Sequence, residues 1–113
     1  MIEVPPDRFE ELVADAIDGI PPDLGSLMDN VWVEVDHRSG SRLLGLYEGI
    51  PLTDRQAYGG MVMPDRITIF RRSICRVCDS EDEVVEQVRT TVVHEVAHHF
   101  GIDDRRLAEL GWD

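Results

Sequence analysis

Three residues late in the chain have the types and the spacing of a metal site. His94, Glu95 and His98 form the pattern HExxH in a stretch that is expected to be helical. Residues four apart on an α-helix lie on one face, one turn apart, so both imidazoles can be directed at one ion. Zinc suits two such imidazoles. Glu95 flanks the same side of the helix, where its carboxylate can accept a proton from water without being a ligand.

A third protein ligand is expected just after this helix, because a catalytic zinc site uses three and keeps one position open. Gly101 is expected to end the helix at a positive φ, and the chain then returns with Asp103 and Asp104. Asp104 completes the pattern HExxHxxGxxD, so we assign it as the third ligand. Asp103 is predicted to cap the last helix instead, and Glu109 is a less favoured candidate.

The other polar residues near the motif are expected to have ordinary roles. His99 is about 100° around the helix from His98, so it is predicted to be exposed or to support the ligands. Tyr47 and Tyr58 are candidates for stabilising an oxyanion beside the metal. A helix with two satisfied core histidines is the competing interpretation, but it does not explain the glycine turn and the returning carboxylate.

The helices that must position these residues can be predicted from hydrophobic spacing. Asp7 is a predicted N-cap for a first helix, and Ser80 with Glu83 predicts a capping box for a later one. The many valines of the later helix are mediocre helix formers, so packing must stabilise it. The expected helices run from Asp7 to Gly19, over a short turn at 24–28, from Glu81 to Phe100 and from Arg105 to Leu110.

Three short strands are expected between these helices. Apolar and polar residues alternate over 31–36, and further apolar runs occur at 43–47 and 67–70. Turn-forming residues at 37–41 predict a β-hairpin between the first two strands, and residues 49–60 are expected to be irregular. The order predicts one α+β domain spanning residues 1–113, with a small mixed or mainly antiparallel sheet packed on an N-terminal and a long helix.

The charge of the chain argues against two classes of partner. The 113 residues include 23 acidic and 11 basic side chains, a formal net charge of -12, and every basic residue is arginine. Such a surface repels nucleic acid and anionic lipid, so neither is expected as a partner. No apolar run approaches the roughly 20 residues of a membrane span, and no secretory leader is visible. We expect a cytoplasmic protein.

Cys75 and Cys78 form one CxxC pair, which is half of a four-thiolate zinc site. A second pair is absent from the chain. Such a site would therefore require a dimer, and we predict that both thiols are structural or incidental.

The stretch from His94 to Asp104, HEVAHHFGIDD, resembles the HExxHxxGxxD motif of the minimal zincins, a family of small bacterial zincin-like metallopeptidases. Residues 64–71 are similar to the strand that enters the motif helix in that family, and the order of elements is similar over nearly the whole chain. The resemblance implies one zinc ion held by His94, His98 and Asp104, with Glu95 as catalytic base. The longer metzincin motif is followed by a methionine turn, whereas all four methionines here precede His94.

The expected function is therefore that of a zinc-dependent metallopeptidase, a hydrolase in which zinc-activated water attacks a peptide bond. The expected partner is a peptide or protein substrate, bound as an added strand at a sheet edge beside the motif helix. The alternative is a non-catalytic zinc-binding domain, in which the metal stabilises the fold and the surface binds a partner.

Overall fold

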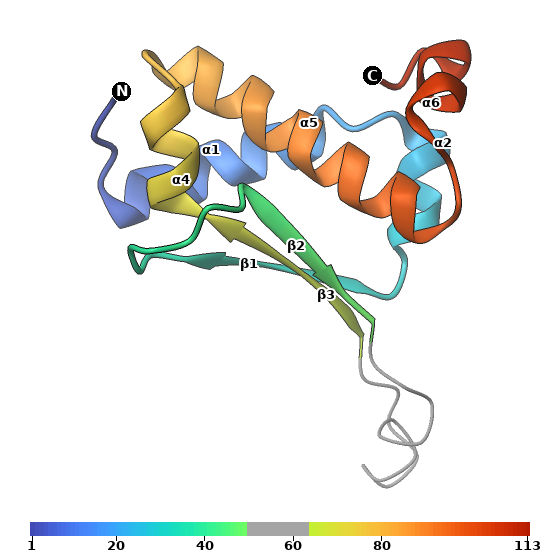
Figure 1. Ribbon diagram of the computed structural model, residues 1–113, viewed down its shortest axis with the longest axis horizontal. Helices are drawn as coiled ribbons and strands as arrows, with labels where there is room; N and C mark the ends of the chain where they lie inside the picture. Colours follow the sequence, from blue (N-terminus) through green and yellow to red (C-terminus); the bar gives the residue numbers. More distant parts are fainter. Residues whose placement is uncertain (50–63) are drawn as a thin grey trace, which may run out of the picture.

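The computed structural model describes residues 1–49 and 64–113 as a small sheet covered by helices on one face (Figure 1). The strands are β1 (Val31–Asp36), β2 (Gly45–Glu48) and β3 (Asp65–Phe70). The helical elements are α1 (Pro6–Asp18), α2 (Pro22–Gly25), the 3-10 turn η1 (Ser26–Met28), α4 (Arg71–Val77), α5 (Glu81–His99) and α6 (Asp104–Leu110). These elements confirm the predicted α+β class.

The sheet is mixed, with the strand order β1-β3-β2. β1 is parallel to β3, and β2 is antiparallel to it. The predicted hairpin between the first two strands is therefore wrong. β3 takes the central position, and its residues Ile67 and Ile69 are fully buried under the helices. Most of the segment predicted to be irregular lies outside the described residues.

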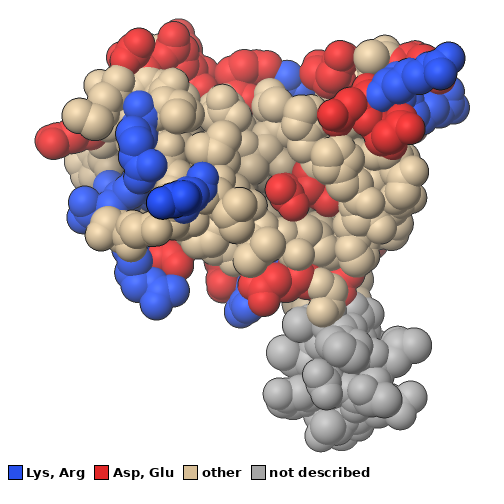
Figure 2. Space-filling view, viewed as in Figure 1, with Lys and Arg blue, Asp and Glu red and all other residues tan. Residues whose placement is uncertain are grey.

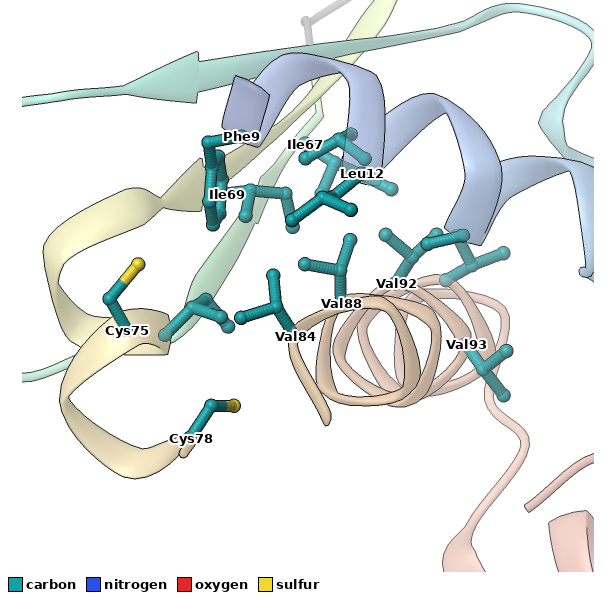
Figure 3. Close-up of a cluster of buried hydrophobic side chains, with 14 of the residues drawn as sticks. Phe9, Leu12, Ile67, Ile69, Cys75, Cys78, Val84, Val88, Val92 and Val93 are labelled. Atoms are coloured by element: carbon teal, nitrogen blue, oxygen red, sulfur yellow. The ribbon is translucent and has the colours of Figure 1, made fainter. Parts of the chain in front are cut away.

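The long helix α5 begins as the sequence predicts and forms the centre of the core. The Ser80 hydroxyl accepts a hydrogen bond from the Glu83 amide at 3.2 Å, which satisfies one of the free N–H groups of the first turn. Val84, Val88 and Val92 are fully buried between α1 and the sheet (Figure 3). Packing on both sides thus compensates for the modest helix propensity of these valines.

The first helix packs on α5 through one apolar face. Its buried residues, Phe9, Leu12, Val13 and Ala16, follow the predicted helical spacing. The predicted cap at Asp7 is wrong, because the helix begins at Pro6 and no side chain caps it. A proline at the first helical position has no amide that needs a partner and a φ already suited to the helix.

One glycine sets the distance between the edge strand β2 and α5. A Cβ atom at Gly45 would lie 2.6 Å from Cγ2 of Thr91 and 3.3 Å from the carbonyl oxygen of Thr68. No side chain fits in that space, so the glycine allows the strand to approach the helix closely.

The helix α4 was not expected, because the sequence predicts a strand at 67–70 and no element for the CxxC segment that follows. Cys75 is buried in α4, and Cys78 is buried directly after it, both as free thiols at the edge of the core (Figure 3). Burial raises the pKa of both thiols above the ordinary value. Both are therefore poor nucleophiles at neutral pH, in agreement with a structural role.

Among the described residues, no helix combines the length and the apolar character that crossing a bilayer requires.

Candidate metal centre

The histidine pair lies on the last turns of α5, at the end of the helix farthest from α4 (Figure 1). The His94 and His98 rings are stacked, with their centroids 5.9 Å apart and their planes 13° from parallel. This is the arrangement that the four-residue spacing predicts. His94 and Glu95 are half-buried, and His98 is exposed.

A glycine turn brings the chain back to this end of α5. Gly101 has a φ of 78° and donates to the carbonyl of His98 at 3.1 Å, and Ile102 donates to that of Ala97 at 2.8 Å. The two bonds form a Schellman motif, which satisfies helix carbonyls while the chain reverses. The predicted role of Gly101 is therefore confirmed.

The two aspartates after the turn have different roles. The Asp103 carboxylate accepts a hydrogen bond from the Arg106 amide at 2.9 Å, which confirms it as the N-cap of α6. Asp104 is the first residue of α6, and its Oδ1 lies 3.0 Å from Nε2 of His98. Glu109 is paired with Arg105 and Arg106, at 3.4 and 3.2 Å.

The donor set matches the chemistry of zinc, although it is not closed around an ion. Two imidazoles and a carboxylate are ordinary zinc ligands. His98 and Asp104, whose Nε2 and Oδ1 lie 3.0 Å apart, would supply two of these ligands. In the part of the chain that the structure describes, no three metal-ligating side chains converge closely enough to enclose an ion. His98 and Asp104 are in direct contact, whereas the centroid of the His94 ring lies 5.9 Å from that of His98 and the two rings are nearly parallel.

Glu95 is placed on the same turn as the pair. Within residues 1–49 and 64–113, its carboxylate and the His94 ring have no hydrogen-bonded or ionic partner.

A second polar cluster joins the end of α5 to the sheet. The Tyr47 ring stacks on the His99 ring at a centroid distance of 3.9 Å, and its hydroxyl donates to Oδ2 of Asp65 at 2.7 Å. His99 Nε2 lies 3.7 Å from the same carboxylate oxygen. His99 is exposed, one of the two predicted placements, and the Tyr47 hydroxyl is directed at Asp65. Tyr58 lies outside the described residues.

The part played by Asp65 was not predicted from the sequence. The register between β2 and β3 is the feature that would have predicted the contact between Tyr47 and Asp65. Tyr47 pairs with Ile67, so Asp65 is the diagonal neighbour of Tyr47 on the same face of the sheet. That register could not be read from the sequence while β2 was assigned to a different partner.

The fold and the motif together define a small α+β protein with a histidine pair at the end of its longest helix. Residues 26–112 match the family model of zincin-like metallopeptidases, and the chain belongs to this family. The match confirms the resemblance drawn from the motif.

One solved structure, a conserved hypothetical protein from Thermus thermophilus, is similar to this chain. The TM-score is 0.51, with 22% sequence identity over 95% of this chain and 98% of that chain. At this identity the likeness shows a shared fold. A comparison with curated proteins gives no significant match.

Proposed function

We propose that the chain is a zinc-dependent peptidase in which His94, His98 and Asp104 hold one zinc ion and Glu95 is the general base. The observation that carries the proposal is the stacked histidine pair with the Asp104 carboxylate 3.0 Å from His98. Membership of the zincin-like metallopeptidase family supports it. When bound, zinc supplies a Lewis acid that polarises a peptide carbonyl and acidifies water.

Glu95 supplies the proton transfers of this reaction. It is adjacent to one proposed ligand and three residues before the other, so its carboxylate would lie beside a bound ion without coordinating it. Glu95 takes a proton from the attacking water and passes it to the departing amine. Such a step contributes roughly 100-fold to 10,000-fold in rate.

The edge strand β2 is the proposed docking site for an extended peptide. It pairs with β3 on one side, and no described strand pairs with its other side. The strand runs beside α5, and Tyr47 contacts the end of that helix through His99. Backbone pairing at this edge holds a peptide with little dependence on its side chains, which fits a broad peptide or protein substrate.

The test compares the wild type with Glu95→Gln, both purified without a histidine tag. Each is assayed for zinc by mass spectrometry and for cleavage of a mixture of unstructured peptides at neutral pH. The variant should keep one zinc per chain and lose at least ~100-fold in rate. Equal cleavage by both proteins would contradict the role of Glu95, and zinc retained in His94→Ala/His98→Ala would contradict the ligand assignment.

A non-catalytic zinc-binding domain is the second candidate. It is favoured by the direct contact between α5 and α6 at His98 and Asp104, which a zinc ion would reinforce. In this case the protein keeps zinc and cleaves no peptide. Removal of zinc lowers the melting temperature under either function, because an ion at a thousandfold excess over its Kd stabilises the folded state by ~4 kcal/mol. Cleavage that depends on Glu95 therefore distinguishes the two.

A further inference from the structure

An open pocket lies at the opposite end of the molecule from the candidate metal centre. It has a volume of about 670 Å³ and is formed by residues 1–5, Ser39 and α4. Backbone and side-chain bonds fix its walls: Ile2 donates to the carbonyl of Cys75 at 3.0 Å, and Arg71 donates to that of Val4 at 2.8 Å. The volume is within the range of small-molecule sites, about 300–1,000 Å³.

Three guanidinium groups line this pocket, those of Arg71, Arg72 and Arg76. Figure 2 shows basic side chains gathered at the end of the molecule where Figure 1 places α4. The other lining residues include Met1, Ile2 and Pro5, whose side chains are apolar. The pocket thus joins cationic groups to an apolar surface, on a chain with a formal net charge of -12.

Among the described residues, these arginines differ from most of the other arginines in having no carboxylate partner. Within the described ranges, ion pairs with Asp or Glu are made by Arg8, Arg38, Arg66, Arg89, Arg105 and Arg106. Arg71 and Arg72 instead donate to neutral acceptors. Arg71 Nε donates to His37 Nδ1 at 2.9 Å, and Arg72 Nε donates to the His37 carbonyl at 3.1 Å.

Arg76 has no hydrogen bond or ion pair within the described residues and lies one helical turn from Arg72. The guanidinium groups of Arg71 and Arg72 are held in place by hydrogen bonds to the backbone or to His37. None of the three positive charges is neutralised by a carboxylate of the described residues. Fixed guanidinium groups of this kind match the oxygens of phosphate and carboxylate.

We propose that this pocket binds a small organic oxyanion, with a phosphate or carboxylate group on the arginines and an apolar body against Met1, Ile2 and Pro5. Glu3 also lines the pocket, and its carboxylate opposes an anion there. The proposal is independent of the metal centre, which lies at the far end of α5 (Figure 1).

The test is a titration with phenyl phosphate, benzoate and phenol, followed by NMR of the arginine Nε–H signals. Phenyl phosphate or benzoate should shift the signals of Arg71, Arg72 and Arg76, and phenol should not. Whichever of the two anions binds with the lower Kd identifies the head group of the ligand as phosphate or carboxylate. Equal shifts with phenol, or no shifts at 10 mM phenyl phosphate (roughly the weak end of measurable affinity), would overturn the proposal.

Substitutions then test the charges. Arg72→Gln and Arg76→Gln should each weaken binding about tenfold, which is the effect of one charge-assisted hydrogen bond. Glu3→Gln should tighten it. The control is Arg105→Gln on α6, which removes the same charge at a side chain that is 90% exposed and should leave the Kd unchanged. Unchanged binding in both the Arg72 and the Arg76 variants would overturn the proposal.

Discussion

His98 Nε2 and Asp104 Oδ1 lie 3.0 Å apart, across the turn that Gly101 makes between α5 and α6. This contact distinguishes Asp104 from its neighbour Asp103, whose carboxylate accepts from the amide of Arg106. The two aspartates are adjacent in sequence but are directed at different partners, so they form a matched pair for mutation.

Asp104→Ala should weaken zinc binding strongly and leave the start of α6 intact. Asp103→Ala should keep zinc and lower the free energy of unfolding by ~1 kcal/mol, the usual cost of losing an N-cap. Zinc affinity from competition with a chelator and stability from urea unfolding measure the two effects. The ligand assignment would be wrong if Asp103→Ala lost zinc and Asp104→Ala retained it.

Gly45→Ala should destabilise the fold by about 1–3 kcal/mol, because the new methyl group overlaps Cγ2 of Thr91, 2.6 Å away. Thr91→Ser removes that methyl group and keeps the hydroxyl, which donates to the carbonyl of Gln87 at 2.8 Å. The double variant should therefore recover part of the stability lost in the single one. The carbonyl of Thr68, 3.3 Å away, limits the recovery. Additive losses in a double-mutant cycle would contradict this account.

The thiols of Cys75 and Cys78 should react slowly with Ellman's reagent in the folded protein at pH 7. Both are buried, and burial raises the pKa of each, so little thiolate is present. Addition of guanidinium chloride should expose both at once. The variant Cys75→Ala/Cys78→Ala should bind as much zinc as the wild type. A halved metal content in that variant would show that the thiols bind an ion.

Asp36 should make stability depend on pH in acid. The guanidinium and the amide of Arg38 donate to its carboxylate and lower its pKa from 3.8 to about 2. A depressed pKa in the folded state stabilises the protein above the unfolded value, and this contribution is lost as the pH falls through about 2. Asp36→Asn should thus be less stable than the wild type at neutral pH, and the difference should shrink below pH 3.8. Urea unfolding across this range checks it. A difference in unfolding free energy between the two proteins that stays constant across this pH range would refute the prediction.

The candidate site was easier to predict from the sequence than the sheet. His94, His98 and Asp104 are set by local geometry, since helix spacing and one glycine turn determine where they lie. The pairing of β1 with β3 is not local, because the two strands are separated by β2 and by residues 50–63. Alternating valines in β1 predict a strand with one buried face, but they do not show which strand pairs with it. The next strand along the chain, β2, was therefore the expected partner, and the predicted hairpin was wrong.

The helix α4 shows a different limit. It spans Arg71–Val77, directly after the last residue of β3, with no side-chain cap to mark its start. Its position depends on bonds from Arg71 to Val4 and His37, which are far away in sequence. Such contacts become visible only when the fold is known.

Because α5 lies at the centre of the core but late in the chain, it is synthesised after most of the residues that it covers. Ile67 and Ile69, together with the apolar face of α1, are covered by a helix that begins only at Glu81. During synthesis these surfaces are exposed until α5 has left the ribosome, because the helix that buries them is made after them. That helix carries His94 and His98, so the histidines come into place in the step that covers these surfaces, and Leu107 of α6 joins the core afterwards.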